Sequence, residues 1–476
     1  FYISYLNPHK IILFMKIAVI GTGYVGLVQG AALADVNHSV ICVDKIKEKI
    51  IHLNEFCEGK RNDLPILEPD LPRLVKENND KKRLIFTTDI NQAVREAKVI
   101  FIAVGTPSNE DGSANLTHVK NVAQDIGRAM NYESDSPIYK IIVTKSTVPP
   151  MTYRMVHDTI AKETKNEFDI VSNPEFLAEG RAVKDCLRPS RIVIGTSNAK
   201  AASIMEELYE PFKSREVSIL FMSNIDAEMV KYASNTYLAA QVSLTNAMAN
   251  LSRELGADWR KVLEGVKKDI RVGRFVYPGL GFGGSCFPKD VRELIHTMEQ
   301  HRPDSDDLSY VKMIVRQNEA QKGMFLPRME KYFSGFEGKK FAIWGTTFKP
   351  ETNDVRESAG VHMIKELLLK GAYVSVYEPS GSEQAMFTLS LDEKLKPHLS
   401  RLSFVSDMYE AVRNAEGLLI TVEWNDFRNP DFLQVKNLLK KPVIFDGKDI
   451  LNPRQMKEEG FDYFSVGRPD VLGYSQ

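Results

Sequence analysis

The chain has 476 residues, of which 43% are hydrophobic and 26% are charged, and its formal net charge is -1. This near-neutral charge gives no support for a nucleic-acid partner, and no apolar run reaches the ~20 residues of a membrane helix. The four cysteines do not make a disulfide framework, and no CxxC or histidine cluster predicts a metal site, so we expect a cytoplasmic protein of two or three domains.

Residues 1–14 precede Met15 and lack the basic start and the small-residue cleavage site of a signal peptide. We interpret them as a non-native or disordered extension. The natural start is then Met15, and the fold is expected from that residue onward.

The first predicted elements form a β-turn-α-β unit. Residues 16–20 (KIAVI) predict a strand, 27–35 a helix and 39–44 (SVICVD) a second strand. The turn, residues 21–26, reads GTGYVG and matches the GxGxxG pattern of dinucleotide-binding proteins.

Each glycine of this pattern has a physical role. Gly21 permits the tight turn, Gly23 lets a pyrophosphate approach the backbone, and Gly26 lets the helix pack on the strand. Asp44 lies 18 residues after Gly26, where a carboxylate accepts from a ribose 2′-hydroxyl and repels a 2′-phosphate. The sequence therefore predicts NAD rather than NADP, although Lys49 nearby weakens this discrimination.

Further apolar strands alternate with helical stretches, which is typical of a parallel, doubly wound sheet. Ligands gather at the carboxyl ends of such strands, where Gly105-Thr106-Pro107 and Ser146-Thr147 are expected. The predicted strands are 99–104, 141–148, 168–176 and 191–196.

Residues 223–255 contain neither Gly nor Pro and predict one helix of about 50 Å that starts at Ser223 or Asn224. A helix of this length suggests a connection between two domains and a dimer interface. Lys231 and Asn235 are spaced i,i+4 and share one face. The alternative is an ordinary lysine at a helix edge. We expect these neighbours to be buried: Met229, Val230, Tyr232 and Leu238.

The last third of the chain repeats the pattern of the first. Residues 407–422 align without gaps on 89–104, and 341–348 and 373–380 match 17–24 and 39–46. We therefore predict a second Rossmann-like domain, without the glycine pattern. There, Lys349 could meet a phosphate and Phe348 could pack on a base or sugar. The alternative is a surface lysine and a core aromatic residue.

Cys286 lies in the run GFGGSCFPKD (281–290). The preceding glycines let the backbone come close to a ligand, and Pro288 suits the first turn of a helix. The sulfur is thus expected just ahead of a helix N-terminus, where the helix dipole favours the thiolate, with Asp290 one turn on. The alternative is a small buried hydrophobic residue, which we expect for the other cysteines, Cys42, Cys57 and Cys186.

Seven motifs occur together in one order, and with them the chain resembles the UDP-glucose/GDP-mannose dehydrogenase family. The resemblance implies an NAD-binding domain at 15–215, a central helical domain at 216–330 and a nucleotide-sugar-binding domain at 331–476. The motifs are GTGYVG (21–26), VGTPS (104–108), KSTVPP (145–150), SNPEFLAEG (172–180), AEMVKYASN (227–235), GFGGSCFPKD (281–290) and FKPETNDVRES (348–358).

The resemblance implies a four-electron oxidation of UDP-glucose to UDP-glucuronate with two NAD. An aldehyde at C6 would be attacked by Cys286 to give a thiohemiacetal, a second hydride transfer would give a thioester, and water would release the acid. A nucleophilic cysteine explains the second oxidation, because a dehydrogenase that stops at the aldehyde needs no thiol.

The resemblance also implies residue roles. Lys231 and Asn235 would stabilise the oxyanion at C6, and Asp290 with Thr147 would act on the water. Glu175 would assist thioester hydrolysis, while Glu179 would touch both substrate and cofactor. NAD would meet Gly21, Gly23, Tyr24, Val25, Gly26, Asp44, Lys49, Thr106, Pro107, Ser146, Thr147, Glu179 and Arg356. The nucleotide sugar would meet Glu175, Phe176, Leu177, Ala178, Glu179, Lys231, Asn235, Arg271, Phe275, Phe282, Gly283, Phe348, Lys349 and Lys448.

Arg271 resembles an arginine that reaches the substrate from a neighbouring subunit, which implies a homodimer or a higher homo-oligomer. Other readings stay open. The substrate could be GDP-mannose or UDP-N-acetylmannosamine. The chain could also be a one-step hydroxyacid dehydrogenase with Lys231 as its base and a structural Cys286, or a non-catalytic regulator that binds NAD and a nucleotide sugar.

Overall fold

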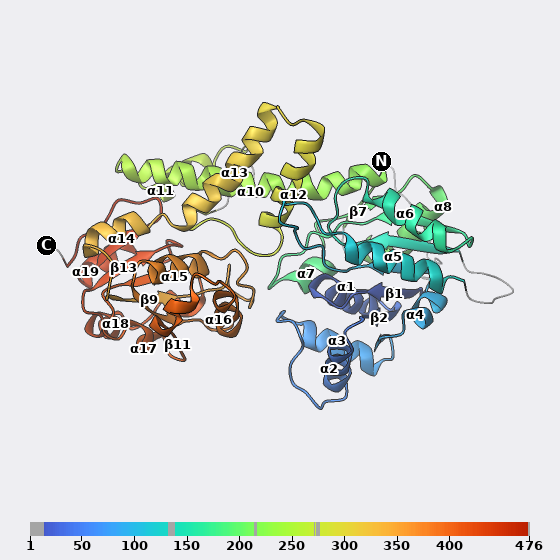
Figure 1. Cartoon of the computed structure of the whole chain (residues 1–476), viewed down its shortest axis with the longest axis horizontal. Helices are drawn as coiled ribbons and strands as arrows, with labels where there is room; N and C mark the ends of the chain where they lie inside the picture. The colour runs from blue at the N-terminus through green and yellow to red at the C-terminus, as the bar shows by residue number, and fades with distance from the viewer. Residues whose placement is uncertain (1–13, 132–138, 214–216, 271, 273–276, 475–476) are drawn as a thin grey trace, which may run out of the picture. The chain divides into compact units, whose positions relative to one another are not determined.

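The structure is a computed structural model that describes residues 14–131, 139–213, 217–270, 272 and 277–474. It divides into two compact units, Phe1–Ala233 and Ser234–Gln476, and each unit is built around a sheet (Figure 1). The proposed extension, residues 1–14, lies outside the described residues except for Phe14. The predicted division into three domains stays a prediction.

The first unit contains an eight-stranded sheet in the order β3-β2-β1-β4-β5-β6-β7-β8. Strands β3 to β6 are all parallel, as the apolar runs predict. The strands are β1 (Lys16–Ile20), β2 (Ser39–Val43), β3 (Leu84–Thr87), β4 (Val99–Ile102), β5 (Lys140–Thr144), β6 (Phe168–Ser172), β7 (Arg191–Gly195) and β8 (Ser218–Met222).

Helices cover both faces of this sheet, because alternate side chains of each strand point to opposite sides. Ile17 and Val19 of β1 belong to one buried core, whereas Ala18 and Ile20 belong to the other. The helices are α1 (Tyr24–Asp35), α2 (Lys47–Cys57), α3 (Leu71–Asp80), α4 (Ile90–Glu96), α5 (Thr117–Ala129), α6 (Thr152–Glu163), α7 (Ala182–Leu187), α8 (Ala199–Leu208) and α9 (Glu210–Lys213).

Strand β7 departs from the predicted parallel arrangement. It meets β6 antiparallel, at the single pair Ser172 and Gly195, and only its other neighbour, β8, is parallel to it. A parallel crossover needs a connection that carries the chain back along the strand. Between β6 and β7 the helix α7 has only six residues, or about 9 Å, and the rest is an irregular loop.

The long helix is confirmed as α10 (Asn224–Glu254), of 31 residues, and Ser223 caps it by accepting from the amide of Asp226. The expected burial beside Lys231 is wrong in part. Tyr232 is buried, but Met229 and Leu238 are exposed. Further apolar side chains along the helix are also exposed. The apolar pattern of this segment therefore marks a helix face that the single chain does not cover.

The second unit begins with the rest of α10 and four helices and ends in a six-stranded parallel sheet, in the order β11-β10-β9-β12-β13-β14. The helices before the sheet are α11 (Trp259–Val266), α12 (Phe287–His301), α13 (Asp306–Lys322) and α14 (Leu326–Phe333). The strands are β9 (Lys340–Trp344), β10 (Tyr373–Tyr377), β11 (Leu402–Val405), β12 (Leu418–Ile420), β13 (Val443–Asp446) and β14 (Asp462–Ser465).

This second sheet confirms the predicted repeat. Its strands succeed one another as do β3-β2-β1-β4-β5-β6 of the first unit. Asp89 and Asp407, which occupy matching places in the aligned segments, cap α4 and α17 in the same way. The remaining helices are α15 (Ala359–Leu369), α16 (Ser382–Ser390), α17 (Met408–Val412), α18 (Phe432–Leu438), α19 (Pro453–Glu458) and the 3-10 turns η1 (Lys396–Arg401) and η2 (Asn425–Phe427).

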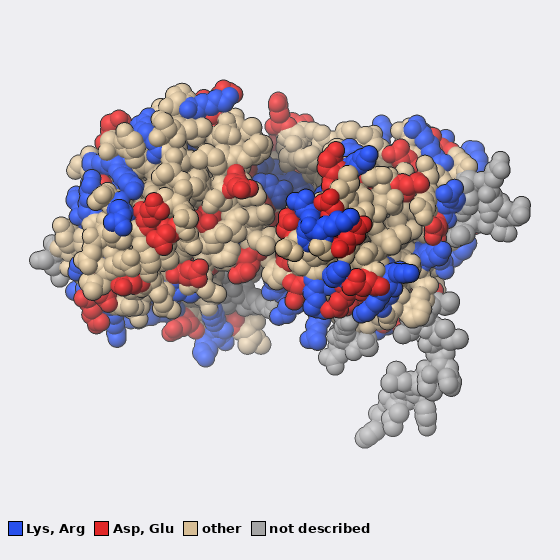
Figure 2. All heavy atoms as spheres, turned by 90° about the horizontal axis from the view of Figure 1, so that it is seen from below, with Lys and Arg blue, Asp and Glu red and all other residues tan. Residues whose placement is uncertain are grey.

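Basic and acidic side chains are intermixed on the face drawn in Figure 2, in keeping with the small net charge. Among the helices of the described ranges, none is both long and apolar enough to cross a membrane. Within the same residues, no group of three or more His, Cys, Asp or Glu side chains could hold a metal ion.

Candidate active site

The glycine turn after β1 is shaped by close packing at two positions and by open space at a third. Gly21 has φ +104°, and a Cβ there would lie 2.6 Å from the carbonyl oxygen of Ala103. A Cβ on Gly26 would lie 1.9 Å from the carbonyl oxygen of Gly21. Gly23, the N-cap of α1, has nothing within 4 Å of such a Cβ. Open space before a helix N-terminus suits a phosphate group.

Asp44 lies beside this turn at the end of β2. Its carboxylate accepts from the amide and the hydroxyl of Thr22 at 3.0 and 2.9 Å and from the amide of Ile46 at 3.1 Å, and it pairs with Lys49 at 3.1 Å. Burial raises the pKa of Asp44, but these hydrogen bonds and the charge of Lys49 outweigh burial and lower it. The group is therefore an ionised acceptor.

A cavity of about 350 Å³ opens from the turn. The sequence predicts part of its lining, namely Gly21, Gly23, Asp44 and Lys49. Helices α4 and α5 add residues that no motif marks: Ile90, His118, Asn121, Val122 and Asp125. A dinucleotide fits this donor set, since the turn would take the pyrophosphate, Asp44 the ribose and the apolar side chains the base.

Two alanine substitutions separate packing from ligand space. We expect Gly26→Ala to destabilise the first unit by about 2 kcal/mol or more, because its Cβ would collide with backbone. Gly23→Ala should leave the melting temperature nearly unchanged and yet weaken NAD binding at least tenfold. Thermal unfolding and NAD titration of both variants check this. Equal NAD affinity of Gly23→Ala and the unaltered chain would show that the open space is not used.

Other residues predicted to contact NAD lie at the ends of β4 and β5. Ser146 Oγ donates to the carbonyl of Val104 at 2.6 Å, and Thr106 Oγ1 donates to the carbonyl of Thr147 at 2.8 Å. These bonds hold the two loops together. Tyr24 and Val25 begin α1, Pro107 follows Thr106, and Glu179 lies in the partly buried loop after β6.

Arg356 belongs to the second unit, where its guanidinium pairs with both carboxylate oxygens of Asp354 at 2.8 and 2.7 Å. The structure thus gives it a structural role in its own loop, and its role toward NAD stays a prediction.

A buried ion pair joins α10 to the loop after β6. Lys231 Nζ lies 2.8 Å from Oε1 of Glu175 and donates to the Glu175 carbonyl at 2.8 Å. Both side chains are nearly inaccessible, at 4% and 5% exposure. Burial raises the pKa of Glu175, but the charge and hydrogen bond of Lys231 outweigh burial and lower it. Glu175 Oε2 also accepts from the amide of Leu177 at 2.6 Å, which bends the loop that carries Phe176 and Ala178.

Thr147 and Lys231 line one small cavity of about 10 Å³. This is about the volume that holds a single water molecule. Glu228, which no motif reading singled out, lines it too. Its carboxylate accepts from Ser172 Oγ at 3.0 Å and from the amides of Met151 and Tyr153 at 2.7 and 3.1 Å, so it ties α10 to the start of α6.

Cys286 is the N-cap of α12, as the sequence predicts, with Pro288 in the first turn. The Cys286 carbonyl accepts from the amide of Asp290 at 2.8 Å, and its Sγ lies 3.5 Å from Ser285 Oγ. It is the one partly exposed cysteine, since Cys42, Cys57 and Cys186 are all described and buried. Burial raises the pKa of these three to about 12, 11 and 11 respectively.

Asp290 is fully buried beneath this helix start. The side-chain Nδ2 of Asn235 donates to Asp290 Oδ2 at 2.5 Å, and Lys289 forms an ion pair with Oδ1. Asn235 and Asp290, to which the resemblance gave separate roles, are therefore brought together.

The glycine run before Cys286 is packed on both sides. Gly281 has φ +82°, and Asn318 of α13 holds Phe282 by two hydrogen bonds, at 2.7 and 3.0 Å. A Cβ on Gly283 would lie 2.6 Å from the carbonyl oxygen of Glu357, and one on Gly284 would lie 2.9 Å from the ring of Phe348.

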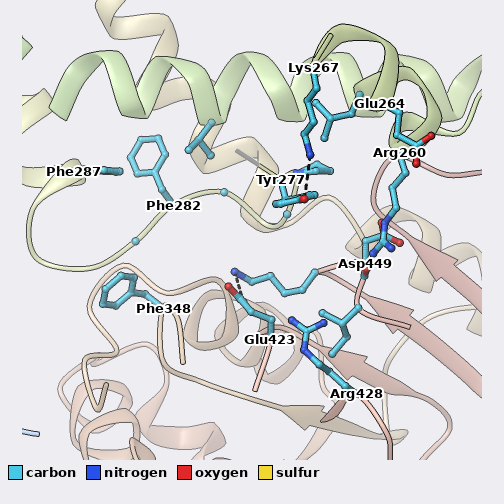
Figure 3. Close-up of a pocket in the computed structure, with 18 residues that line it drawn as sticks. Arg260, Glu264, Lys267, Tyr277, Phe282, Phe287, Phe348, Glu423, Arg428 and Asp449 are labelled. Atoms are coloured by element: carbon cyan, nitrogen blue, oxygen red, sulfur yellow. Dashed lines mark hydrogen bonds and ion pairs between the residues drawn. The ribbon is translucent and has the colours of Figure 1, made fainter. Parts of the chain in front are cut away.

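A pocket of about 700 Å³ opens in the second unit (Figure 3). Four residues predicted to contact the nucleotide sugar line it: Phe282, Gly283, Phe348 and Lys448. Lys349 is not in the lining; its Nζ lies 5.4 Å from the centre of the Phe348 ring. The lining also holds residues that sequence reasoning missed: Arg260, Glu264, Lys267, Tyr277, Glu423 and Arg428.

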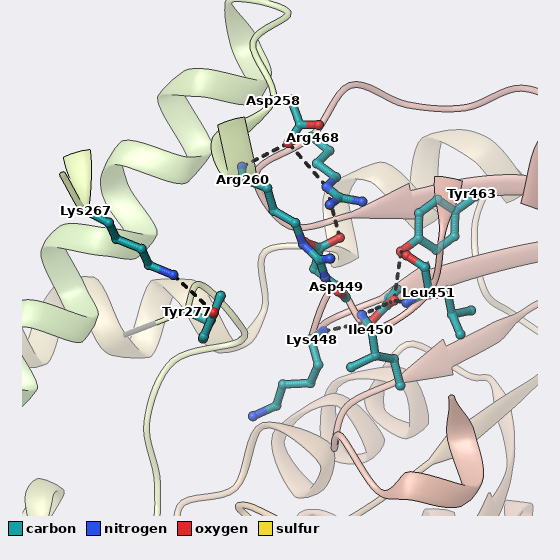
Figure 4. A network of polar contacts seen from close by, with 11 residues as sticks. Asp258, Arg260, Lys267, Tyr277, Lys448, Asp449, Ile450, Leu451, Tyr463 and Arg468 are labelled. Carbon is teal, nitrogen blue, oxygen red and sulfur yellow. Dashed lines mark hydrogen bonds and ion pairs between the residues drawn. The ribbon is translucent and has the colours of Figure 1, made fainter. Parts of the chain in front are cut away.

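The wall around Lys448 is a network of polar contacts (Figure 4). Asp449, which is 5% exposed, pairs with Arg260 at 2.7 Å and with Arg468 at 3.3 Å. Lys448 itself pairs with Glu423 at 2.9 Å. Arg260 and Asp449 are 189 residues apart, so only the fold could reveal their contact. Arg271 and Phe275 lie outside the described residues.

Comparison with known proteins agrees with the two sites described above. The models of the UDP-glucose/GDP-mannose dehydrogenase family match in three parts: the NAD-binding domain at 15–213, the central domain at 225–320 and the UDP-binding domain at 342–453. The chain belongs to the UDP-glucose/GDP-mannose dehydrogenase family.

Relatives within the family match over nearly their full length. A UDP-glucose 6-dehydrogenase of Bacillus subtilis is 39% identical, with 96% of this chain and 94% of the relative covered. One of Pseudomonas aeruginosa is 38% identical, with 96% and 98% covered. The solved UDP-glucose dehydrogenase of Pyrobaculum islandicum matches with a TM-score of 0.85 at 32% identity, covering 97% and 99%.

These comparisons confirm the predicted family resemblance. They also confirm that the chain is an oxidoreductase, that its cofactor is NAD, and that the fold is of the α/β class with a Rossmann-like NAD-binding domain.

Proposed function

We propose that this member of the family oxidises UDP-glucose to UDP-glucuronate, with two NAD consumed for each sugar. The observation that carries the proposal is the placement of Cys286 at the N-terminus of α12, where a thiolate is favoured. The relatives named UDP-glucose 6-dehydrogenase support UDP-glucose as the substrate, ahead of GDP-mannose and UDP-N-acetylmannosamine.

The nucleotide part of the substrate would lie in the 700 Å³ pocket of the second unit. Phe282 and Phe348 offer apolar surface there, and Lys448 offers a cation on a loop whose turn is fixed by buried Asp446. The cations of the lining, which are Lys448, Arg260, Lys267 and Arg428, outnumber its carboxylates, which are Glu264, Glu423 and Asp449, and this suits a diphosphate.

For the first oxidation, the glycine turn and Asp44 would hold NAD, which supplies the hydride acceptor for C6 of the sugar, and the proton of the C6 hydroxyl would pass to water. Lys231 would stabilise the alkoxide that develops at the C6 oxygen, because its buried ammonium is shielded from bulk solvent and therefore interacts strongly with a developing charge. Asn235 would donate to the same oxygen. Glu175 would keep Lys231 oriented through the 2.8 Å ion pair.

Cys286 would make the second oxidation possible. Its thiolate adds to the C6 aldehyde and forms a C–S bond, and the carbonyl oxygen takes up a proton to give a thiohemiacetal. The second hydride from C6 would pass to a second NAD and the hydroxyl proton to water, which leaves a thioester.

Hydrolysis would then return the enzyme to its starting state. Water adds to the thioester carbonyl, the C–S bond breaks, and the products are a carboxylate and the free thiol. Thr147 lines the water-sized cavity beside Lys231, and Glu175 would take the proton of the attacking water. Asp290, fixed by Asn235, would assist from the helix that Cys286 caps.

We also propose that two copies associate through α10. Four apolar side chains on the part of α10 in the second unit are exposed in the single chain and repeat at three, four or seven residues: Tyr237, Leu244, Met248 and Leu251. Such spacing places them along one helix face. Sedimentation of the full chain and of Leu244→Glu tests this, with a monomer expected for the variant only.

The proposed reaction is tested by counting NADH released per sugar with UDP-glucose, GDP-mannose and UDP-N-acetylmannosamine in turn. We expect two NADH per UDP-glucose and the highest kcat/KM for that substrate. One NADH per sugar would leave the thiol without a role, and a preference for another sugar would change the substrate but not the chemistry.

Cofactor choice gives a further prediction. Asp44→Ala should weaken the binding of NAD and strengthen the binding of NADP. The carboxylate no longer repels a 2′-phosphate, and Lys49 is freed from its ion pair. The ratio of kcat/KM for the two cofactors should shift toward NADP by about tenfold or more. An unaltered ratio would mean that another group reads the ribose.

A further inference from the structure

We propose that Glu357 is a positioning residue for Cys286, because its carboxylate ties the helix after the thiol to α13 and its backbone, together with that of Arg356, lies against the glycine run before the thiol. The proposal rests on the nucleophilic role given to Cys286 above. Glu357 itself is not among the residues that line the substrate pocket.

The side chain of Glu357 bridges two helices. Oε1 lies 3.0 Å from Nη1 of Arg292 in α12, and Oε2 lies 2.9 Å from Nζ of Lys322 at the end of α13. Arg292 follows Cys286 by six residues, about 9 Å along the helix that the cysteine caps. The carboxylate therefore fixes the direction of this helix relative to α13.

The backbone at Glu357 holds the other side of the thiol. The carbonyl of Arg356 accepts from the amide of Gly284 at 2.8 Å. The carbonyl oxygen of Glu357 approaches Gly283 so closely that a Cβ there would lie 2.6 Å away. Glu357 has φ +55°, a conformation that few non-glycine residues adopt, so the surrounding contacts must hold it.

The charges around Glu357 favour its ionised form. Burial raises the pKa of Glu357, but Arg292 and Lys322 outweigh burial and lower it. Lys322 is 3% exposed in its side chain and has one other carboxylate partner, Glu319, at 2.9 Å. His362 of α15 lies within reach of the charges of Lys322 and Glu319, as do Glu366 and Lys365 of the same helix within reach of His362, and burial lowers the pKa of His362.

Orientation of α12 matters because the helix dipole stabilises a thiolate only at its own N-terminus and within about one turn. If the carboxylate is lost, α12 and the glycine run can shift relative to each other. The thiol of Cys286 should then be less acidic and less reactive. Since the pKa of Glu357 is lowered in the folded chain, the bridge is intact at neutral pH and is lost as pH falls through that value.

The test is the rate at which iodoacetamide alkylates Cys286 in the full chain, measured from pH 6 to 10 for Glu357→Gln and for Glu319→Gln. The other three cysteines are buried, so the reaction reports Cys286. Glu319→Gln is a matched control because Glu319 also pairs with Lys322 but forms no ion pair with α12 among the described residues.

We expect Glu357→Gln to react about threefold to tenfold more slowly at pH 7, with its rate midpoint displaced to higher pH. Glu319→Gln should behave like the unaltered chain. Arg292→Gln removes only the α12 end of the bridge at a position that is 34% exposed, so it should fold and shift the profile in the same direction. If Glu357→Gln does not fold, the alkylation profile of Arg292→Gln alone tests the proposal.

Alkylation profiles of Arg292→Gln and any folded Glu357→Gln that match the unaltered chain would overturn the proposal. Failure of the proposed function looks different, since the unaltered enzyme would then release one NADH per sugar whatever these variants do to alkylation.

Discussion

We expect Cys286→Ser to lower the net production of UDP-glucuronate from UDP-glucose by about 10³-fold or more. A serine hydroxyl is a poorer nucleophile at neutral pH, and an ester with it is cleaved less readily than a thioester. The variant should still bind NAD as the unaltered chain does, because the glycine turn and Asp44 are in the first unit. Mass spectrometry of the sugar products measures the acid directly.

Cys57→Ala provides a matched loss of a thiol away from the proposed site. Cys57 is buried at the end of α2, and its replacement should leave acid production unchanged. Full acid production by Cys286→Ser would refute the nucleophilic role, whereas a shared loss in both variants would point to a general effect on stability.

Lys231→Met should slow hydride transfer by about 10²–10³-fold, which corresponds to ~2–4 kcal/mol of lost transition-state stabilisation. The variant also leaves Glu175 buried without its cation, so the pKa of that carboxyl should rise. Single-turnover measurement of NADH formation reports the chemical step apart from product release.

Lys140→Met is the control for losing a buried lysine. Lys140 is equally inaccessible, and its Nζ donates to the carbonyls of Val94, Arg95 and Ala97 at the end of α4. We expect it to lower the melting temperature without slowing hydride transfer in the enzyme that remains folded. Unchanged single-turnover rates in Lys231→Met would remove this residue from the catalytic group.

The fold could be predicted where local patterns decide it. Short apolar runs and the glycine turn indicate the first sheet, and the gapless match of 89–104 with 407–422 indicates the second. The direction of β7 relative to β6 could not be predicted, because it depends on how far the connection between these two strands carries the chain back along the sheet. The exposure of Met229 and Leu238 was also missed, since an apolar helix face reads alike whether its own chain or another copy covers it.

The candidate site also contains residues that the sequence could predict and residues that it could not. Contiguous motifs placed Cys286 before a helix and put Asn235 and Asp290 on elements that meet. The wall of the nucleotide pocket from α11 could not be predicted, because Arg260 belongs to no motif and contacts Asp449 far along the chain. Nor does Glu228 stand out in sequence, although it lies one turn before Lys231.

The most direct test is to quench the enzyme during steady turnover of UDP-glucose, digest it, and weigh the peptide that contains Cys286. We predict a fraction of this peptide carrying the glucuronyl group of UDP-glucuronate as a thioester, which hydroxylamine removes. If acid accumulates while no adduct on Cys286 is ever found, even under acid quench within one turnover, the thiol mechanism is wrong.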